Sequence, residues 1–236
     1  MEEKPEMTLI LGWNHGAPFL LQEFDRYIAQ NSKTTVMSKF IIEKMEQACR
    51  YLQLKYQNMQ FVQADITNRT ELETMHIPQS QHVILLSYSD CQDIQEAEAQ
   101  TLITLLPLRE IANQSNNHFS IASEILNNRN REFAEITRAD NFIVTQKRVG
   151  LMLSQRSKNR YLAPLFQDVF DPAGVEIYLK PIDHSLQLGT AINFYLLIEA
   201  DKRRNKVASG YRIAAQSNDP SAAYLGFTST HLKNID

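Results

Sequence analysis

Hydrophobic and polar positions change their pattern near residue 145. Before that point, short apolar and β-branched runs alternate with longer amphipathic stretches. The runs hold few polar positions, which is the pattern of strands covered on both faces. Strands are predicted at Thr8–Trp13, Thr34–Ser38, Met59–Gln63, His82–Ser87, Phe119–Ser123 and Asn141–Val144.

The stretches between these runs predict helices, because each has one apolar face. Leu20, Leu21 and Phe24 share such a face, and a longer helix is predicted from Ile94 to Asn113. Pro107 falls inside the longer helix, where it costs about 3 kcal/mol unless the helix kinks or restarts. The alternation of strand and helix predicts an α/β fold with a doubly wound, mostly parallel, Rossmann-like sheet.

After residue 145 the pattern predicts two helices, Lys147–Asn159 and a stretch that ends at Asp171-Pro172. A half-exposed strand EIYLKP, an amphipathic helix LQLGTAINFYLLIEADKRRN and a strand VASGYRIAA follow. We therefore expect a Rossmann-like lobe over residues 1–145, a pair of connecting helices over 146–174 and a small α+β lobe over 175–236.

Composition narrows the class of protein. With 43% hydrophobic and 22% charged residues, the 236-residue chain is ordinary for a globular protein. The formal net charge of -3 gives no electrostatic reason to expect nucleic acid as a partner. The acidic start MEEKPEM is unlike a signal peptide, and no apolar run approaches the roughly 20 residues that span a bilayer. We expect a soluble polypeptide, which could still be a piece of a membrane protein.

Neither the cysteines nor the basic residues indicate a site. Cys49 and Cys91 lack the short spacing of a thiolate metal site or a disulfide framework. The basic run over residues 202–206 closes a predicted helix, where cations complement the helix dipole.

The loop in LILGWNHGAP resembles the turn that holds the pyrophosphate of a dinucleotide. The three positions of the fingerprint G-x-G-x-x-G/A are occupied by Gly12, Asn14 and Ala17, so the glycine nearest the ligand is absent. The alternative is a tight strand-to-helix turn with Pro18 at the first helical position, which the pattern favours.

Two other positions bear on a nucleotide. The second strand ends in Lys39 instead of an acid, which favours a phosphate or no ligand over a ribose. Asp65 follows the third strand, where it is either a ribose or adenine contact or a turn residue. The candidate ligand-binding residues are Gly12, Asn14, His15, Gly16, Lys39 and Asp65.

Acidic residues after the fourth predicted strand are candidates for calcium, which takes several carboxylate oxygens from a loop. Asp90, Asp93 and Glu96 form this candidate site. Their spacing is not that of an EF-hand, and acids at a helix start are also stabilised by the helix dipole.

No set of residues assembles a nucleophile, a base and an oxyanion donor, so the sequence predicts a non-catalytic protein. Tyr51 and Lys55 have the Y-x-x-x-K spacing of short-chain dehydrogenases. They follow the second strand, far from the late helix where that pair acts, and we interpret the spacing as chance.

Four stretches resemble the cytosolic regulatory region of CASTOR/POLLUX-type ion channels. These stretches are LILGWNHGAPFLLQEFDRYIA, SYSDCQDIQEAEAQTLITLLPLREIA, ASEILNNRNREFAEITRADNFIV and FDPAGVEIYLKP. The resemblance extends over roughly Thr8 to Pro220. Its most specific part is ILNNRNREFAEITRADNFIV, whose order of residues has no generic packing explanation.

The resemblance implies a regulatory module of an ion channel. In that family, RCK-type domains (regulators of K⁺ conductance) follow the membrane helices, and each has a Rossmann-like lobe, a crossover helix pair and a small C-terminal lobe. It implies that residues 146–174 form the crossover pair, through which modules become a homo-oligomer and assemble as a gating ring under the membrane pore domain. The chain would then be part of a channel on the cytoplasmic side of a membrane, with membrane segments preceding it. Its hinge would lie near Thr145 to Gly150.

The departures from the family leave the ligand open. Nucleotide-binding RCK domains have a complete glycine fingerprint and an acid after the second strand, and this chain has neither. Calcium-binding members use acidic clusters in varied positions, so a nucleotide and Ca²⁺ both remain possible cofactors. Two alternatives also stay open: an NAD(P)-binding oxidoreductase with a degenerate glycine loop, and a separate soluble RCK-type subunit of a potassium transport system.

Overall fold

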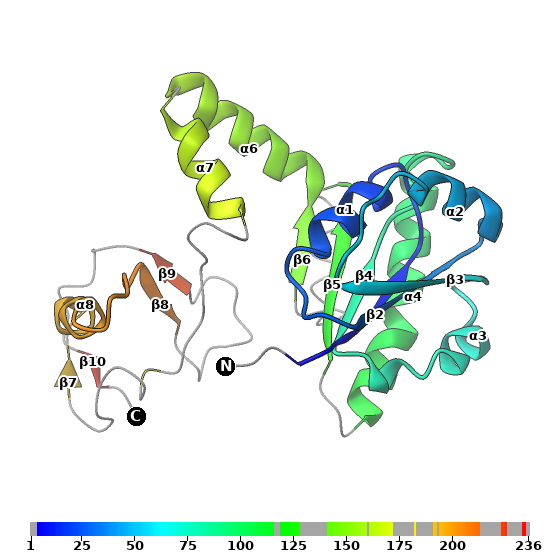
Figure 1. Ribbon diagram of the computed structural model, residues 1–236, viewed down its shortest axis with the longest axis horizontal. Coiled ribbons are helices and arrows are strands. Elements are labelled where there is room, and N and C mark those ends of the chain that lie inside the picture. Colours follow the sequence, from blue (N-terminus) through cyan, green and yellow to red (C-terminus); the bar gives the residue numbers. More distant parts are fainter. Residues whose placement is uncertain are drawn as a thin grey trace. The chain divides into compact units, whose positions relative to one another are not determined.

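The computed structural model divides the chain into two compact units, Met1–Val175 and Glu176–Asp236 (Figure 1). It describes residues 4–115, 119–127, 141–159, 161–171, 182, 191–192, 194–212, 223–225 and 233–234. Most of the run ILNNRNREFAEITRADNFIV and all of the predicted strand EIYLKP lie outside the described residues.

The first unit is built on a six-stranded sheet in which every described pair of neighbouring strands is parallel. The strands are β1 (Met7–Leu11), β2 (Ser32–Ser38), β3 (Gln57–Gln63), β4 (His82–Leu85), β5 (Ser120–Ile125) and β6 (Asn141–Val144). Their order, β3-β2-β1-β4-β5-β6, reverses direction between β1 and β4. The doubly wound Rossmann-like sheet predicted from the sequence is confirmed.

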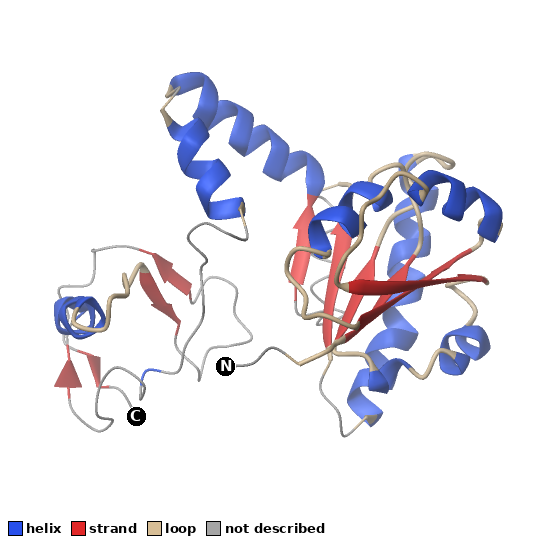
Figure 2. Ribbon diagram, in the orientation of Figure 1, coloured by secondary structure: helices blue, strands red, loops and turns tan. Residues whose placement is uncertain are grey.

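Helices cover both faces of this sheet (Figure 2). They are α1 (Ala17–Phe24), α2 (Ile42–Cys49), α3 (Arg69–Thr74), the short 3-10 helix η1 (Ile77–Gln79) and α4 (Ile94–Gln114). The central strand β1 is packed from both sides, since Leu9, Ile10 and Leu11 are at most 2% exposed. This is why its sequence shows no alternation of apolar and polar positions.

Pro107 lies within α4 without ending it, because the helix runs from Ile94 to Gln114. Thr104, Leu105 and Leu108 around the proline are buried, so packing against the sheet holds the helix through this position. The missing N–H still removes one hydrogen bond from the helix.

Pro107→Ala is therefore expected to raise the free energy of unfolding by about 1 to 3 kcal/mol, because it restores that hydrogen bond and removes a ring clash. Urea denaturation followed by circular dichroism measures the change. Gln100→Ala, also in α4, is the control and is expected to stay within about 0.5 kcal/mol of the wild type. An unchanged or lowered midpoint for Pro107→Ala would show that the helix is adapted to the proline.

Two further helices follow β6 along the chain. They are α6 (Thr145–Lys158) and α7 (Leu162–Phe170), which contact each other. Thr145 is the first residue of α6, and Gly150 lies in the interior of that helix. A hinge at these two residues stays a prediction.

Among its described residues, the second unit has two small antiparallel pairs and one α-helix. Its elements are β7 (Ala191–Ile192) paired with β10 (Lys233–Asn234), β8 (Gly210–Arg212) paired with β9 (Ala223–Leu225), and α8 (Phe194–Lys202). The Phe194 and Tyr211 rings lie with their centroids 5.8 Å apart and join the helix to β8. The predicted α+β character is confirmed, but the helix predicted from Leu186 is wrong at its start, since residues 191–192 form a strand.

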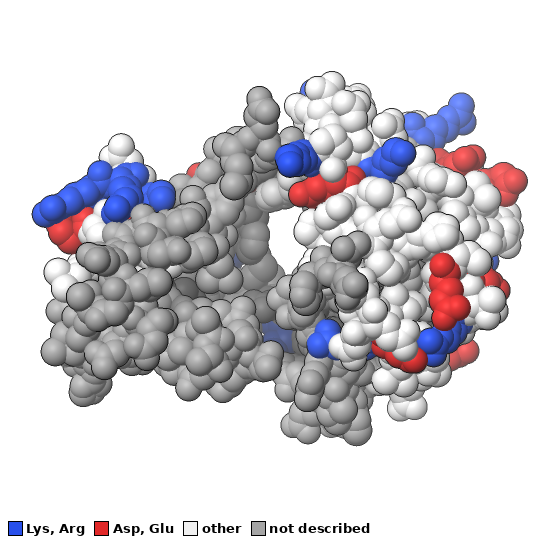
Figure 3. All heavy atoms as spheres, turned by 90° about the horizontal axis from the view of Figure 1, so that it is seen from below, with Lys and Arg blue, Asp and Glu red and all other residues white. Residues whose placement is uncertain are grey.

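The end of α8 carries the basic run of the second unit (Figure 3). Arg203 Nε donates to Glu199 Oε1 at 3.2 Å, and Arg204 Nη1 donates to the Ala200 carbonyl at 3.2 Å. These contacts fit a solvated helix end in which cations bind the last carbonyls of the helix.

Candidate functional site

The candidate site lies at the carboxyl ends of the parallel strands, where the strand order reverses between β1 and β4. Open α/β sheets bind ligands in the crevice at such a reversal. The loop after β1, residues 12–16, enters α1 at this point, with Gly16 as the N-cap and Pro18 in its first turn.

Gly12 is required by the backbone itself. Its φ is +88°, and its N–H donates to the Met37 carbonyl at 2.9 Å. A Cβ at this position would lie 2.2 Å from the Leu86 carbonyl oxygen. Glycine at position 12 is thus explained by the close approach of β1 to the end of β4, with or without a ligand.

Asn14 fills the position where a pyrophosphate would require glycine. Its side chain is 6% exposed, and Nδ2 donates to the Ser87 carbonyl and to Glu124 Oε2, both at 2.9 Å. Its Oδ1 accepts from the Gly16 N–H at 3.0 Å. Asn14 therefore ties the loop after β1 to the ends of β4 and β5, using the protein's own groups.

The amide groups at the start of α1 are also occupied. In phosphate-binding folds such amides face the ligand anion. Here the Asp90 carboxylate accepts from both the backbone N–H and Nδ1 of His15. The Ala17 N–H donates to the Asn14 carbonyl at 3.0 Å, and Pro18 has no N–H to offer. An internal carboxylate thus stands where a bound phosphate would be expected.

Tyr88 links the loop after β4 to the end of β2. It is 2% exposed, and its hydroxyl lies 3.2 Å from Ser38 Oγ and accepts from the Lys39 N–H at 3.2 Å. The side chain therefore reaches from the end of β4 across β1 to the end of β2, where a dinucleotide ribose would bind. The Lys39 ammonium lies 4.5 Å from the ring centroid, and burial raises the pKa of the Tyr88 hydroxyl.

Asp65 shapes the turn before α3. Its Oδ1 accepts from the Thr67 N–H at 2.9 Å and from the Thr67 hydroxyl at 2.8 Å. Asn68 then caps α3 by accepting from the Thr70 N–H at 3.1 Å. The structure thus places Asp65 in the local hydrogen bonds of a turn, and its role toward a nucleotide stays a prediction.

The acidic residues after β4 take separate positions. Asp93 caps α4, since its Oδ1 accepts from the N–H groups of Gln95 and Glu96 at 2.7 and 3.3 Å. Asp90 contacts His15, as described above, and the buried Glu98 accepts from the Asn127 N–H. Within the described ranges, no three His, Cys, Asp or Glu side chains gather as metal ligands. A calcium site at Asp90, Asp93 and Glu96 stays a prediction.

Groups that could act in catalysis lie elsewhere in the first unit. Tyr51 is 87% exposed just after α2, and the Lys55 N–H donates to Asp25 at 2.7 Å. Burial raises the pKa of the Cys49 thiol to about 11, so this thiol stays protonated near neutral pH and is a poor nucleophile.

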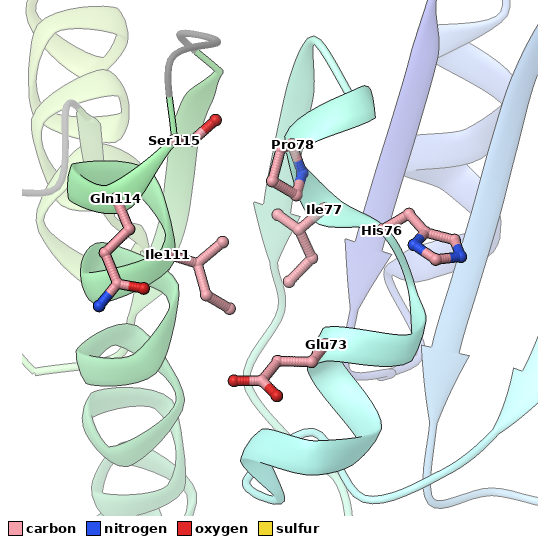
Figure 4. Close-up of a pocket in the computed structure, with 7 residues that line it drawn as sticks. All are labelled: Glu73, His76, Ile77, Pro78, Ile111, Gln114 and Ser115. Carbon is pink, nitrogen blue, oxygen red and sulfur yellow. The ribbon is translucent and has the colours of Figure 1, made fainter.

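A hollow of about 280 Å³ lies near the carboxyl end of α4 (Figure 4). It is lined by Glu73, His76, Ile77, Pro78, Ile111, Gln114 and Ser115. Ile77 and Ile111 face each other across it, whereas His76 points away from the gap (Figure 4).

A glycine at position 14 is not expected to create dinucleotide binding, because Tyr88 and Asp90 keep their contacts with Ser38 and His15. Asn14→Gly is expected to lower the free energy of unfolding by about 1 to 3 kcal/mol, since buried acceptors lose a donor. Thermal-shift measurement with and without NAD tests both parts. The control is Asn31→Gly at an exposed position with φ 69°, where glycine is expected to be tolerated. A midpoint that rises with NAD in Asn14→Gly would contradict this expectation.

Comparison with known proteins places the chain beside plant ion channels. It is 19% identical over 246 residues to the probable ion channel SYM8 of Pisum sativum, covering 90% of this chain and 28% of that protein. It is 19% identical over 245 residues to the ion channel CASTOR of Lotus japonicus, covering 90% and 29%. The resemblance to CASTOR/POLLUX channels found in the sequence is thereby confirmed. The chain spans less than a third of the length of these relatives.

No family model matches the chain. The RCK domain of the GsuK channel superposes with a TM-score of 0.43 at 11% identity, over 63% of this chain and 28% of that one. None of the helices in the described part is long and apolar enough to cross a membrane.

Proposed function

We propose that this chain is a non-catalytic regulatory module of a CASTOR/POLLUX-like cation channel, placed on the cytoplasmic side of a membrane. The observation that carries the proposal is the similarity to named ion channels along nine tenths of the chain. Its mechanism would be a population shift, in which a ligand or partner that prefers one arrangement of the modules biases the gate of the pore domain.

The helices α6 and α7 support assembly through a homo-oligomeric contact. Val149, Leu151 and Leu153 of α6 are 50%, 51% and 64% exposed, and Leu165 of α7 is 54% exposed. Apolar side chains at this density on one helical pair are typical of a surface that is covered by a partner. We propose that the partner is the same surface of a second copy.

The charge of α6 gives this contact a testable salt dependence. The helix contains Lys147, Arg148, Arg156 and Lys158 and no acidic residue. Two such helices repel each other at low ionic strength, and added salt screens the repulsion. Self-association is therefore expected to strengthen as the salt concentration rises.

Leu153→Glu is expected to weaken self-association at least about tenfold, because it places a charge in a desolvated contact. Light scattering coupled to gel filtration, at tens of micromolar protein and at two salt concentrations, measures the effect. Gln155→Glu adds the same charge to an exposed position of α6 and is the control. A wild-type chain that stays monomeric at both salt concentrations would contradict assembly through α6 and α7.

The hydrogen bonds of the loops after β1 and β4 bear on the oxidoreductase alternative. An oxidoreductase requires a bound dinucleotide, and the hydrogen bonds that Asn14, Tyr88 and Asp90 make within the protein favour the regulatory module over that alternative. A thermal-shift screen with NAD, NADP, ATP, ADP and Ca²⁺ tests the ligand-sensor form of the proposal. A ligand at 100 times its dissociation constant should stabilise the fold by about 2.7 kcal/mol. A separate RCK-type subunit would pass all of these tests and differs only in being made as its own chain.

A further inference from the structure

The hollow near the carboxyl end of α4 has an apolar middle and polar ends. In Figure 4, Glu73 lies at one end of the gap and Ser115 at the other. Ile77 and Ile111 face each other between these ends (Figure 4). None of the lining residues belongs to the loops after β1 and β4. The hollow is therefore separate from the crevice in which Rossmann-like folds bind nucleotides.

The size of the hollow limits what it can hold. Its volume of about 280 Å³ has room for about nine water-sized atoms, at about 30 Å³ for each. This space is too small for a nucleotide and sufficient for a short aliphatic ligand. The two isoleucines in the middle favour an alkyl chain there, because apolar surface is removed from water on both partners.

The end of the hollow at Glu73 is negative. Glu73 contributes a carboxylate to the lining, and none of the lining residues is a lysine or an arginine. The nearby Arg69 divides its guanidinium between two carboxylates. Its Nε donates to Glu73 Oε1 at 2.8 Å, and its Nη1 donates to Glu110 Oε2 at 2.6 Å. One cation between two anions leaves a net negative charge, which attracts a cationic group of a ligand.

The end of the hollow at Ser115 is also negative, because α4 ends there. The last residue of α4 is Gln114, and the last turn of this helix holds no basic side chain. The carboxyl end of a helix carries a partial negative charge, which a cation stabilises. The amide nitrogen of Gln114 donates to Glu110 Oε1 at 3.0 Å, so its Oε1 oxygen can accept from a ligand.

We propose that this hollow binds a linear aliphatic diamine, with one ammonium group at Glu73, the carbon chain between Ile77 and Ile111, and the other ammonium group at the carboxyl end of α4. Glu110, which shares a guanidinium with Glu73, lies one turn before Gln114. One turn is about 6 Å along the helix, which suits a chain of about four carbon atoms. Alkylammonium groups have a pKa of about 10 and are charged at neutral pH. This inference goes beyond the proposed function and does not rest on it, because it concerns a site within one chain.

Methyl NMR of the full chain, with labelled isoleucine Cδ1 groups, tests the proposal. 1,4-Diaminobutane is titrated in, and the signals of Ile77 and Ile111 are assigned by replacing each residue with valine. Both signals are expected to shift in a saturable manner, with a dissociation constant below about 1 mM. Ile10, in the central strand, is expected to keep its signal unchanged. Butane-1,4-diol carries no charge and n-butylamine carries one, so each is expected to bind at least about ten times more weakly.

Glu73→Gln tests the charge at one end of the hollow. Its side chain is 52% exposed, and exposed ion pairs contribute little to stability, so the variant is expected to fold. It is expected to weaken diamine binding at least about tenfold. Glu46→Gln removes the same charge from an exposed position on α2 and is expected to leave binding unchanged. The proposal would be overturned by unshifted Ile77 and Ile111 signals, by a diol or butylamine that binds as tightly as the diamine, or by equal weakening in both variants.

Discussion

Gly12→Ala is expected to lower the free energy of unfolding by about 4 kcal/mol or more, enough to unfold a marginally stable domain. The added Cβ would lie 2.2 Å from the Leu86 carbonyl oxygen, which is backbone and has no rotamer with which to move away. Relief would require β1 and the end of β4 to separate, although Leu86 N–H donates to the Leu11 carbonyl at 2.8 Å. The φ of +88° adds strain for any residue with a side chain.

Chemical denaturation, with the yield of folded protein as a second measure, tests this effect. Gly150→Ala is the matched control, since nothing lies within 4 Å of the added Cβ and the position is inside a helix. The control is expected to be neutral or to gain up to about 1 kcal/mol. If both glycine variants were equally stable, the close approach of β1 and β4 described here would be incorrect.

The strands of the first unit were predictable because their residues carry the pattern locally. Asn141–Val144 agrees with the sequence prediction at both ends, and the other strands differ by a few residues. The short helix α3, Arg69–Thr74, was not predicted. It buries only Leu72, so no apolar repeat marks it, and its signals are the Asn68 cap and the acid at Glu71.

Only part of the candidate site could be predicted from the sequence. The absence of glycine at position 14 was visible, but the partners of Asn14 were not, since Glu124 lies 110 residues away. Tyr88, which follows β4, reaches Ser38 at the end of β2 because only one strand, β1, lies between β4 and β2 in the sheet. Spacing along the chain does not specify that order, so contacts made across it had no sequence signal.

The contacts of the loops after β1 and β4 bear on ligand binding. All six predicted ligand residues make hydrogen bonds within the protein: Gly12, Asn14, His15, Gly16, Lys39 and Asp65. We therefore expect a dinucleotide in the usual pose to compete with the contacts of Tyr88 and Asp90. Regulation through the proposed assembly at α6 and α7 requires no such ligand.

Asp25→Ala is expected to lower the free energy of unfolding by about 3 kcal/mol or more, the second largest effect. The Asp25 carboxylate, 4% exposed, accepts from the N–H groups of Lys55, Tyr56 and Gln57 at 2.7, 3.0 and 3.0 Å. It thereby fixes the start of β3 to the end of α1. Alanine would leave three backbone donors without their acceptor, and each such group costs about 1 to 3 kcal/mol when buried.

Asp25→Asn tests the hydrogen bonds alone, because asparagine keeps the size and shape of the aspartate side chain. Its one carbonyl oxygen can replace Oδ1, which serves Tyr56 and Gln57, but its NH₂ group would face the Lys55 N–H that Oδ2 now accepts. A loss of about 1 to 2 kcal/mol is therefore expected, between wild type and Asp25→Ala. Glu46→Ala, an exposed acid on α2, is the charge control and should change stability by less than about 0.5 kcal/mol. Equal losses in Asp25→Ala and Glu46→Ala would mean that net charge, and not the three hydrogen bonds, explains the effect.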